Sequence, residues 1–255
     1  MEAREVSDPK ILVLDIERIP IQFSGDAWSL NDMKGRRIPV DWVTRWSRTI
    51  CFAYRWYGQK KISFHAEWDE GGNKGMHEAA WELYNDADVV VGHNIQNFDT
   101  KKLQGGWVEH GLGLPSPVKH FDTLLVARNK LGFDANHLDT LTKRFGLRSK
   151  TDHYTIKVAE GAVAGDVKKQ RELRSYNVGD IDASTDLFEY LRPIGNLNFA
   201  AFSDDDERRC RACAGTNVQR RGYAVKLKGK YPRYACMDCG SWSTGSKAVH
   251  MAELS

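Results

Sequence analysis

The sequence predicts an α/β fold in which one sheet is covered by helices, followed by a small cysteine-containing unit. Three observations carry this prediction. Short apolar runs such as Lys10-Ile-Leu-Val-Leu-Asp15 are typical of buried central strands. Up to about residue 200 these runs come first and then alternate with helical segments, which favours a single mixed sheet with helices packed on it. After residue 203 the chain instead carries four cysteines in two close pairs.

The elements follow from local patterns along the chain. Short apolar and β-branched runs predict strands over 10–15, 49–54, 61–65 and 88–92. Longer segments with apolar residues three and four apart predict helices over 75–86, 99–110, 122–131, 138–145 and 168–191. Pro193 is expected to close the last helix. Residues 20–48 follow no clean period, and we expect an irregular insertion that packs on the domain or lines a cleft with Trp28, Trp42 and Trp46.

The hydrophilic, acidic segment 203–207 predicts a boundary between a domain of residues 1–203 and a second one of residues 204–255. The two parts differ in charge, since residues 204–255 carry a net charge of +4 and residues 1–203 a net charge of −1. Residues 208–235 include nine basic residues and no acidic one. This asymmetry indicates a polyanionic partner, and a solvated basic face is the alternative interpretation.

Composition narrows the class of protein. With 255 residues, of which 41% are hydrophobic, the chain can bury a sizeable core, which excludes wholesale disorder. The mean hydropathy is −0.54, and no run approaches the roughly 18 apolar residues of a membrane span, so no membrane partner is expected. The first ten residues lack an apolar signal segment, so we expect a cytoplasmic protein whose five cysteines do not form disulfides.

Acidic side chains occur at the ends of three expected elements that are far apart in the sequence. Asp15 and Glu17 end the first strand, and because residues two apart on a strand face the same side, both carboxylates face one site. Asp99 follows the strand at 88–92, and Tyr176 and Asp180 share one face of the last helix. Each signal alone is typical of a helix cap or of packing. Four carboxylates at one site would need cations such as Mg²⁺ or Mn²⁺, and two such ions about 4 Å apart support phosphoryl displacement.

Asp15-x-Glu17, Asn94-x3-Phe98-Asp99 and Tyr176-x3-Asp180 resemble the three motifs of the DEDD superfamily of 3′–5′ exonucleases. The last motif, with tyrosine, is similar to the DEDDy variety, whose best-known members are the proofreading domains of family A and B DNA polymerases. The resemblance covers roughly residues 8–195 and implies a ribonuclease H-like fold. The segments Asp122-Thr123 and Leu138-Asp139-Thr-Leu-Thr also resemble the stretch between the second and third motifs.

The resemblance implies a role for each motif residue. Asp15, Glu17 and Asp180 would ligate the metal ion that activates water, and Asp15 would bridge to a second ion with support from Asp99. Tyr176 would orient the water, since a phenol with a pKa of about 10 is a poor base at neutral pH. Ile16 and Asn94 are the expected contacts to the terminal nucleotide. Other polar residues nearby are expected to be structural or to face elsewhere; these are His93, Asp122, His153, Asp182 and Asp186.

The cysteines at the end of the chain form two Cys-x2-Cys pairs, Cys210 with Cys213 and Cys236 with Cys239, separated by 22 residues. Four thiolates at this spacing predict a zinc ribbon with one structural zinc ion, since zinc prefers a tetrahedron of such ligands. The alternative, two disulfides, is disfavoured in a reducing compartment. Cys51, the fifth cysteine, lies in an apolar strand and is expected to be buried.

Basic and aromatic residues alternate between the two cysteine pairs. Cations for phosphates and rings for bases indicate a surface for single-stranded nucleic acid. The alternative interpretation is that the tyrosines form the small core of the ribbon and that the charges only keep it soluble. The expected contacts are Arg220, Arg221, Lys226, Lys228, Lys230 and Arg233, interleaved with Tyr223, Tyr231 and Tyr234.

The function predicted from these features is a metal-dependent 3′–5′ exonuclease that acts on single-stranded nucleic acid with a free 3′ end, with DNA favoured and RNA open. A compact exonuclease with a zinc ribbon is similar to nucleases carried by bacteriophages. Two other classes remain open. One is a non-catalytic nucleic-acid-binding protein, or an adaptor whose ribbon docks a replication or repair protein. The other is a structure-selective endonuclease on the same fold.

Overall fold

A five-stranded mixed sheet forms the centre of the computed structural model, which describes residues 9–27, 29, 35, 37–148, 154–203 and 207–251. The strand order is β5-β4-β1-β6-β7, with β1 in the middle. β1 pairs antiparallel with β4 and parallel with β6. The strands are β1 (Ile11–Ile19), β4 (Arg48–Trp56), β5 (Ser63–Ala66), β6 (Val89–Gly92) and β7 (Lys119–Asp122).

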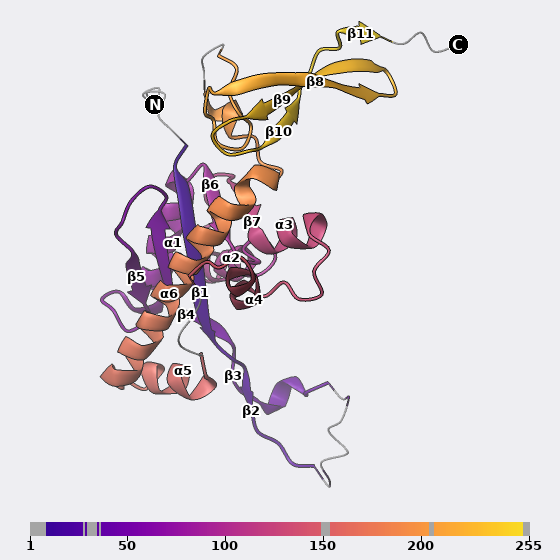
Figure 1. The fold of residues 1–255 in the computed structure, drawn as a ribbon. Coiled ribbons are helices and arrows are strands. Elements are labelled where there is room, and N and C mark those ends of the chain that lie inside the picture. Colours follow the sequence, from indigo (N-terminus) through magenta and orange to yellow (C-terminus); the bar gives the residue numbers. More distant parts are fainter. Residues whose placement is uncertain are drawn as a thin grey trace.

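Helices cover both faces of this sheet (Figure 1). Leu12, Leu14 and Ile16 of β1 pack against α1 and α2, whereas Ile11 and Val13 face the side covered by α3, α4 and α6. The alternation of a strand with apolar residues on both faces explains why β1 is buried on both sides. The helices are α1 (Gly72–Asp86), α2 (Asp99–Glu109), α3 (Thr123–Lys130), α4 (Leu138–Arg144), α5 (Ile156–Val163) and α6 (Val167–Leu191).

The 25-residue helix α6 is the longest element and runs along β1 (Figure 1). Its first turn is capped by Asp166, which accepts hydrogen bonds from the amides of Lys168 and Lys169. At the other end, Pro193 lies in a short 3-10 turn, η3 (Arg192–Ile194), as the sequence predicts. At a rise of about 1.5 Å per residue the helix spans roughly 37 Å, so it joins distant parts of the molecule.

Most expected elements are present, and their bounds differ in an informative way. β1 continues to Ile19 where a strand ending at residue 15 was expected, because Ile16 and Ile19 are buried while the residues between them are partly exposed. β7 and α5 were not expected from the sequence. Helix α3 begins at Thr123, one residue later than predicted, because Asp122 is its N-cap.

The described residues between 20 and 47 form an extension that projects from the end of β1 and β4 (Figure 1). It contains the short antiparallel pair β2 (Gln22–Phe23) and β3 (Val43–Arg45) and a 3-10 turn, η2 (Val40–Trp42). The ring of Trp42 lies against Gly25 so closely that no Cβ would fit there, whereas Trp46 is exposed. Trp28 lies outside the described residues. Apart from this small ladder, the described part of the segment is therefore largely irregular, as predicted.

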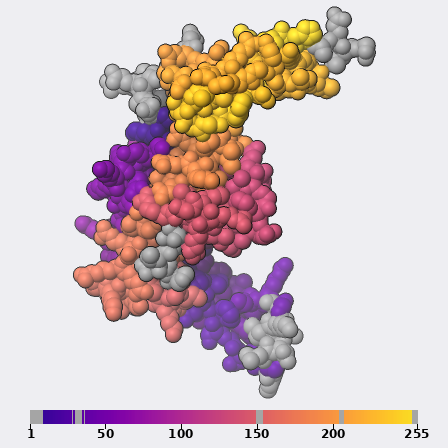
Figure 2. Space-filling model, in the orientation of Figure 1, coloured from indigo at the N-terminus to yellow at the C-terminus, as the bar shows by residue number. Residues whose placement is uncertain are grey.

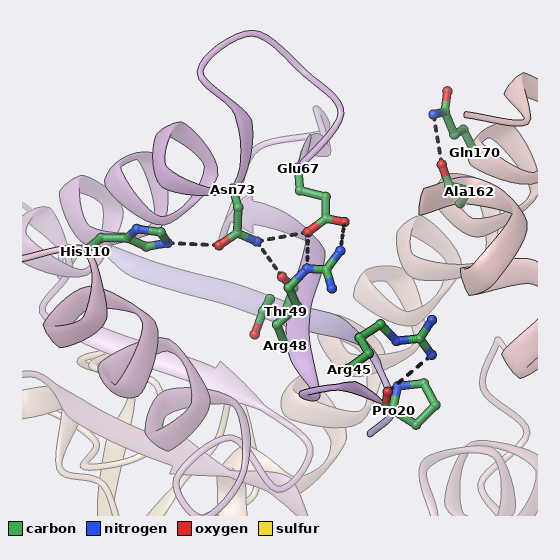
Figure 3. A network of polar contacts seen from close by, with 9 residues as sticks. All are labelled: Pro20, Arg45, Arg48, Thr49, Glu67, Asn73, His110, Ala162 and Gln170. Carbon is green, nitrogen blue, oxygen red and sulfur yellow. Dashed lines mark hydrogen bonds and ion pairs between the residues drawn. The ribbon is translucent and has the colours of Figure 1, made fainter. Parts of the chain in front are cut away.

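A polar network fixes the outer end of β4 beside this extension (Figure 3). Arg48 donates two hydrogen bonds of 2.8 Å to the carboxylate of Glu67. Asn73 donates to the carbonyl of Thr49 at 2.9 Å and to Glu67 at 3.1 Å. The oxygen of Asn73 accepts a 2.9 Å bond from the ring of His110. These contacts tie β4 to α1 and α2, and so hold the strand that pairs with β1.

The cysteine-containing unit lies at the opposite end of the molecule from the extension (Figures 1 and 2). Its strands are β8 (Val218–Lys226), β9 (Gly229–Cys236), β10 (Trp242–Thr244) and β11 (His250–Met251). It packs on the end of α6, where the amide of Phe199 donates to Arg211 and the Ser241 hydroxyl donates to the carbonyl of Pro193. The expected boundary at 203–207 includes residues 204–206, which lie outside the described residues. None of the described helices is both long and apolar enough for a membrane span.

Candidate functional site

Three carboxylates converge on the α6 side of β1. Asp15 and Glu17 come from β1 and Asp180 comes from the middle of α6, and one oxygen of each lies within 4.8 Å of the others. Strand alternation puts Asp15 and Glu17 on one face, away from Ile16. The ladder between β1 and β4 shifts register just after Glu17, and such bulges re-aim side chains near functional sites. Among the described residues, this is an acidic group that could hold a divalent cation.

Asp99 approaches the same stretch of β1 from the other side. It is the first residue of α2, is buried, and accepts a 3.2 Å hydrogen bond from the amide of Ile16. Burial raises the pKa of Asp99 to about 7, and the charge of Asp122 adds to this, while the Ile16 amide and its own amide lower it. Asp99 therefore holds the backbone between Asp15 and Glu17 without joining the group of three.

Asn177 is a site residue that the sequence analysis missed. It is fully buried, and its side-chain amide donates to the carboxylate of Asp15 at 2.7 Å and to the carbonyl of Asp15 at 3.2 Å. It lies three residues before Asp180 on α6, so both side chains share a face of the helix. That spacing was the available signal. Asn177 fixes the carboxylate of Asp15 in the orientation that faces Asp180.

Tyr176 lies one turn before Asp180 on the same helix and is half-buried. Its ring centroid is 6.0 Å from that of Tyr154, a second residue that sequence reasoning missed. The hydroxyl of Tyr154 donates to the carbonyl of Arg18 at 2.5 Å. Burial raises the pKa of Tyr154 to about 12, and the charge of Glu17 contributes to the rise. Tyr154 thus packs between the end of β1 and Tyr176, and no sequence motif marked it.

The two residues expected to contact a nucleotide, Asn94 and Ile16, lie in different surroundings. Asn94 has a positive φ of 69° in the loop after β6, and its backbone amide donates to the carboxylate of Asp122 at 3.0 Å. Asp122 also caps α3 and accepts from the amide of Gln96, so its role is structural, as predicted. Ile16 is only 5% exposed and its side chain packs in the core against α1 and α2. Contacts of Ile16 and Asn94 with a nucleotide stay predictions.

Two further acids of α6, Asp182 and Asp186, are engaged with arginines. Asp182 pairs with Arg55 at 2.7 Å and with Arg148 at 3.0 Å, and Asp186 pairs with Arg148 at 2.6 Å. His93 bonds through its ring to the hydroxyl of Thr123 at 2.9 Å, which is consistent with a structural role. His153 lies outside the described residues. The neighbouring acids of α6 are therefore held in ion pairs on another face of the helix.

The four cysteines at the end of the chain form a second cluster. Their sulfur atoms all lie within 4.8 Å of one another, with 3.6 Å between Cys210 and Cys239 and 3.6 Å between Cys213 and Cys236. None of the five cysteines is in a disulfide, and Cys51 is buried in β4 as expected. Zinc–sulfur bonds of about 2.3 Å in a tetrahedron would separate the sulfurs by about 3.8 Å, so the arrangement fits zinc.

The predicted basic surface lies on the β8–β9 hairpin, which projects from the ribbon (Figure 1). Its cations lie over aromatic rings: Arg220 and Lys230 over Tyr223, Lys226 over Tyr231, and Arg233 over Trp242, at 4.2 to 4.9 Å from the ring centroids. Arg221 bonds to Gln219, and Lys228 is exposed in the turn. The tyrosines are therefore partners of the cations and not the core of the ribbon, which consists of Cys210, Ala212 and Cys236.

No protein-family model matches this chain, and no curated protein matches it. Among solved structures, it is similar to the family B DNA polymerase from the hyperthermophilic archaeon Pyrobaculum calidifontis. The identity is 15% and the TM-score is 0.49, over 89% of this chain and 33% of the polymerase chain. The chain therefore spans about a third of the length of that structure.

Proposed function

We propose that this chain is a metal-dependent 3′–5′ exonuclease of the DEDDy type, with a ribonuclease H-like body and a C-terminal zinc ribbon. The observation that carries the proposal is the convergence of Asp15, Glu17 and Asp180 within 4.8 Å. These acids come from elements 165 residues apart in the sequence, and packing alone gives no reason to gather them. The buried carboxylate of Asp99, bonded to the amide between two of them, supports the same centre.

The donor set suits hard divalent cations. Asp15, Glu17 and Asp180 would hold Mg²⁺ or Mn²⁺ through carboxylate oxygens, and Asp99 would support the backbone that presents them. Three like charges this close repel one another unless a cation offsets them. When bound, two such ions activate a water molecule and stabilise the charge on the attacking and leaving oxygens of a phosphodiester.

Other residues of the chain would hold the metal ligands and the attacking water in position. Asn177 holds one oxygen of Asp15 by a 2.7 Å hydrogen bond and so would fix the orientation of that carboxylate. Tyr176, one turn from Asp180, would hold the attacking water by a hydrogen bond from its hydroxyl. Tyr154 packs against the ring of Tyr176 and bonds to the end of β1, so it would keep that hydroxyl in place.

The substrate proposed is single-stranded nucleic acid with a free 3′ end, with DNA favoured over RNA. The projecting β8–β9 hairpin supports a single-stranded substrate, because its cations lie over aromatic rings. The cysteine cluster holds the base of the hairpin. Phosphates would bind the cations, and bases could stack on the exposed rings. The zinc ion would be structural, because four cysteines leave no ligand position open.

The test is a time course on 5′-labelled single-stranded DNA and RNA with Mg²⁺, Mn²⁺ or EDTA. A metal-dependent ladder that shortens from the 3′ end is expected. Asp15→Ala should lower the rate roughly a thousandfold, since a metal ion contributes several kcal/mol and about 1.4 kcal/mol corresponds to a factor of ten.

Asp182→Asn is the matched control, because Asp182 lies on α6 beside Asp180 but pairs with Arg55 and Arg148. Its rate should stay near that of the wild type. Equal loss in both variants would point to a folding defect and contradict the assignment. No cleavage of either strand, with salt-sensitive binding retained, would favour a non-catalytic nucleic-acid-binding protein, and internal cuts would favour an endonuclease.

A further inference from the structure

A groove of about 650 Å³ lies between the ribbon and the segment that follows α6. One wall is the 3-10 turn η4 (Phe199–Phe202) with Asn198 before it, and the other is the face of the ribbon that carries Tyr234. This groove does not contain any of the six basic residues that the sequence analysis assigned to nucleic acid. It is therefore a separate feature of the molecule.

The lining of the groove is strongly basic. It includes Arg208, Arg209, Arg211 and Lys247, and no carboxylate lines it among the residues that the structure describes. Hydroxyl groups of Ser243 and its neighbours also line the groove. Cations with interspersed hydroxyls are the groups that contact phosphate oxygens in nucleic-acid complexes.

Two of these arginines bond to backbone carbonyls inside the protein. Arg211 donates to the carbonyl of Gly195 at 2.9 Å, and Arg209 donates to the carbonyl of Ala214 at 3.2 Å. A carbonyl accepts the bond but carries no net charge, so a positive potential remains. Arg209 also pairs with the exposed Glu207 at 3.5 Å, so the positive potential of the groove rests on Arg208, Arg211 and Lys247.

An aromatic surface continues the groove onto the hairpin. The guanidinium of Arg208 lies 4.5 Å from the ring centroid of Tyr234. Tyr234 and Lys230 are four residues apart on β9 and share a face, and Lys230 in turn lies 4.2 Å from the ring of Tyr223. The groove and this face therefore form a path of alternating cations and rings, which suits the phosphates and bases of a single strand.

We infer that this groove binds single-stranded nucleic acid on the 5′ side of the end that is processed. This role rests on the proposed exonuclease function, although the binding itself does not. The groove follows the end of α6, and Asp180 lies 11 residues before that end, which corresponds to roughly 16 Å of helix. A strand held at both places would extend along the molecule, so longer strands should bind more tightly than short ones.

The test measures binding of a 5′-fluorescein oligothymidylate of about 16 nucleotides in EDTA, across a salt series. Arg208→Gln combined with Lys247→Gln should raise the Kd about tenfold and lower the salt slope by about 1.4, at about 0.7 per phosphate contact. Lys74→Gln combined with Lys143→Gln removes the same charge from exposed helical sites and should leave the slope unchanged. Tyr234→Leu should weaken binding about fivefold or more, and Tyr234→Phe should not.

Zinc content and the thermal midpoint of each variant establish that the ribbon is folded. Equal Kd values and slopes in the groove and control variants would overturn the inference. Displacement of the oligonucleotide by an equimolar hexaglutamate peptide would also overturn it, because the groove would then take an acidic peptide. If the groove residues contribute to binding but the protein cleaves nothing in Mg²⁺, the groove binds nucleic acid and the proposed exonuclease function is wrong.

Discussion

The two clusters of metal-binding side chains in this protein differ in what surrounds them. The carboxylates of Asp15, Glu17 and Asp180 lie on β1 and α6, which pack in a core that runs through the whole body. The four cysteines lie in a unit whose buried cluster consists of Cys210, Ala212 and Cys236, with few other apolar groups against it. In the ribbon, the ligands themselves are most of the core.

This difference separates metal for folding from metal for chemistry. A unit of this size buries too little apolar surface to fold alone, so metal binding and folding are coupled in the ribbon. The body gains its stability from Leu12, Leu14, Phe188 and their neighbours, and its acids lower that stability by repulsion. Zinc would therefore stabilise the ribbon strongly, whereas Mg²⁺ or Mn²⁺ would stabilise the body only by relieving repulsion.

Removing zinc should have the largest effect. Structural zinc binds with apparent free energies of about 10–16 kcal/mol in small zinc domains, so a strong chelator should unfold residues 208–245. Amide hydrogen exchange should show loss of protection in β8 and β9, while β1 and α6 keep theirs.

Cys213→Ser should give the same result, and Cys51→Ala is its matched control because Cys51 is buried in β4 of the body. The control should retain one zinc ion per chain. A ribbon that stays protected in the chelator would remove the contrast between the two regions.

Neutralising one acid should instead stabilise the body. In EDTA, Asp180→Asn should raise the free energy of unfolding by about 1 kcal/mol, because it reduces repulsion among three carboxylates that lie within 4.8 Å. The same variant should lose the increase in stability that Mg²⁺ gives the wild type. Urea unfolding with and without Mg²⁺ measures both effects.

Asp186→Asn, on the same helix, should show the opposite sign. The hydrogen bond from Arg148 lowers the pKa of Asp186, so its charge stabilises the fold at neutral pH. Destabilisation by both substitutions would mean that the carboxylate of Asp180 is held by favourable contacts, and the functional interpretation of the cluster would weaken.

The carboxylates were predictable from the sequence because the pattern of a strand or helix fixes which residues share a face. Asp15 and Glu17 are two apart on a strand, and Tyr176 and Asp180 are four apart on a helix, so each pair could be placed without the structure. The spacing of the cysteines was equally informative, because ligand number and geometry restrict it.

Other features depend on tertiary contacts that no local pattern encodes. Tyr154 belongs to the site only because the chain returns to Arg18, which lies 136 residues earlier. β7 is four residues long with three polar side chains, and becomes a strand through its pairing with β6. α5 is a short, apolar helix that exists by packing against Ile19 and Leu173. Elements of four and eight residues are shorter than the stretch over which periodicity assigns a strand or a helix from one sequence.

Loss of Asn177 should have an intermediate effect that depends on the metal. Asn177→Ala removes the 2.7 Å hydrogen bond to Asp15, and partners that orient metal ligands typically contribute ten- to hundredfold in affinity or activity. The Mg²⁺ concentration for half-maximal activity should rise by about that factor, and saturating Mg²⁺ should restore much of the rate.

Ser184→Ala, another buried polar residue of α6, is the control, and its Mg²⁺ dependence should match that of the wild type. A rate defect in Asn177→Ala that saturating Mg²⁺ does not relieve would assign the residue to packing only.

Mild acid should also destabilise the body, and it acts through His77. This residue of α1 is 3% exposed, and its ring lies so close to Gly106 of α2 that no Cβ would fit there. Burial lowers the pKa of His77 to about 4, with a contribution from the charge of His110. His77 therefore binds a proton near pH 6.5 in the unfolded chain but only near pH 4 in the folded chain. The free energy of unfolding falls as the pH drops from about 6.5 to about 4.

The slope should reach at most about 1.4 kcal/mol per pH unit for this one proton, and His77→Gln should remove it. His137→Gln, at an exposed residue before α4, should leave the slope unchanged. Urea unfolding of the body at pH 6.5 and 5.0, followed by exchange of β1 amides, measures the difference. Equal slopes in the wild type and His77→Gln would mean that the helices α1 and α2 open enough to hydrate the ring, and the body would then be less rigid than its buried core implies.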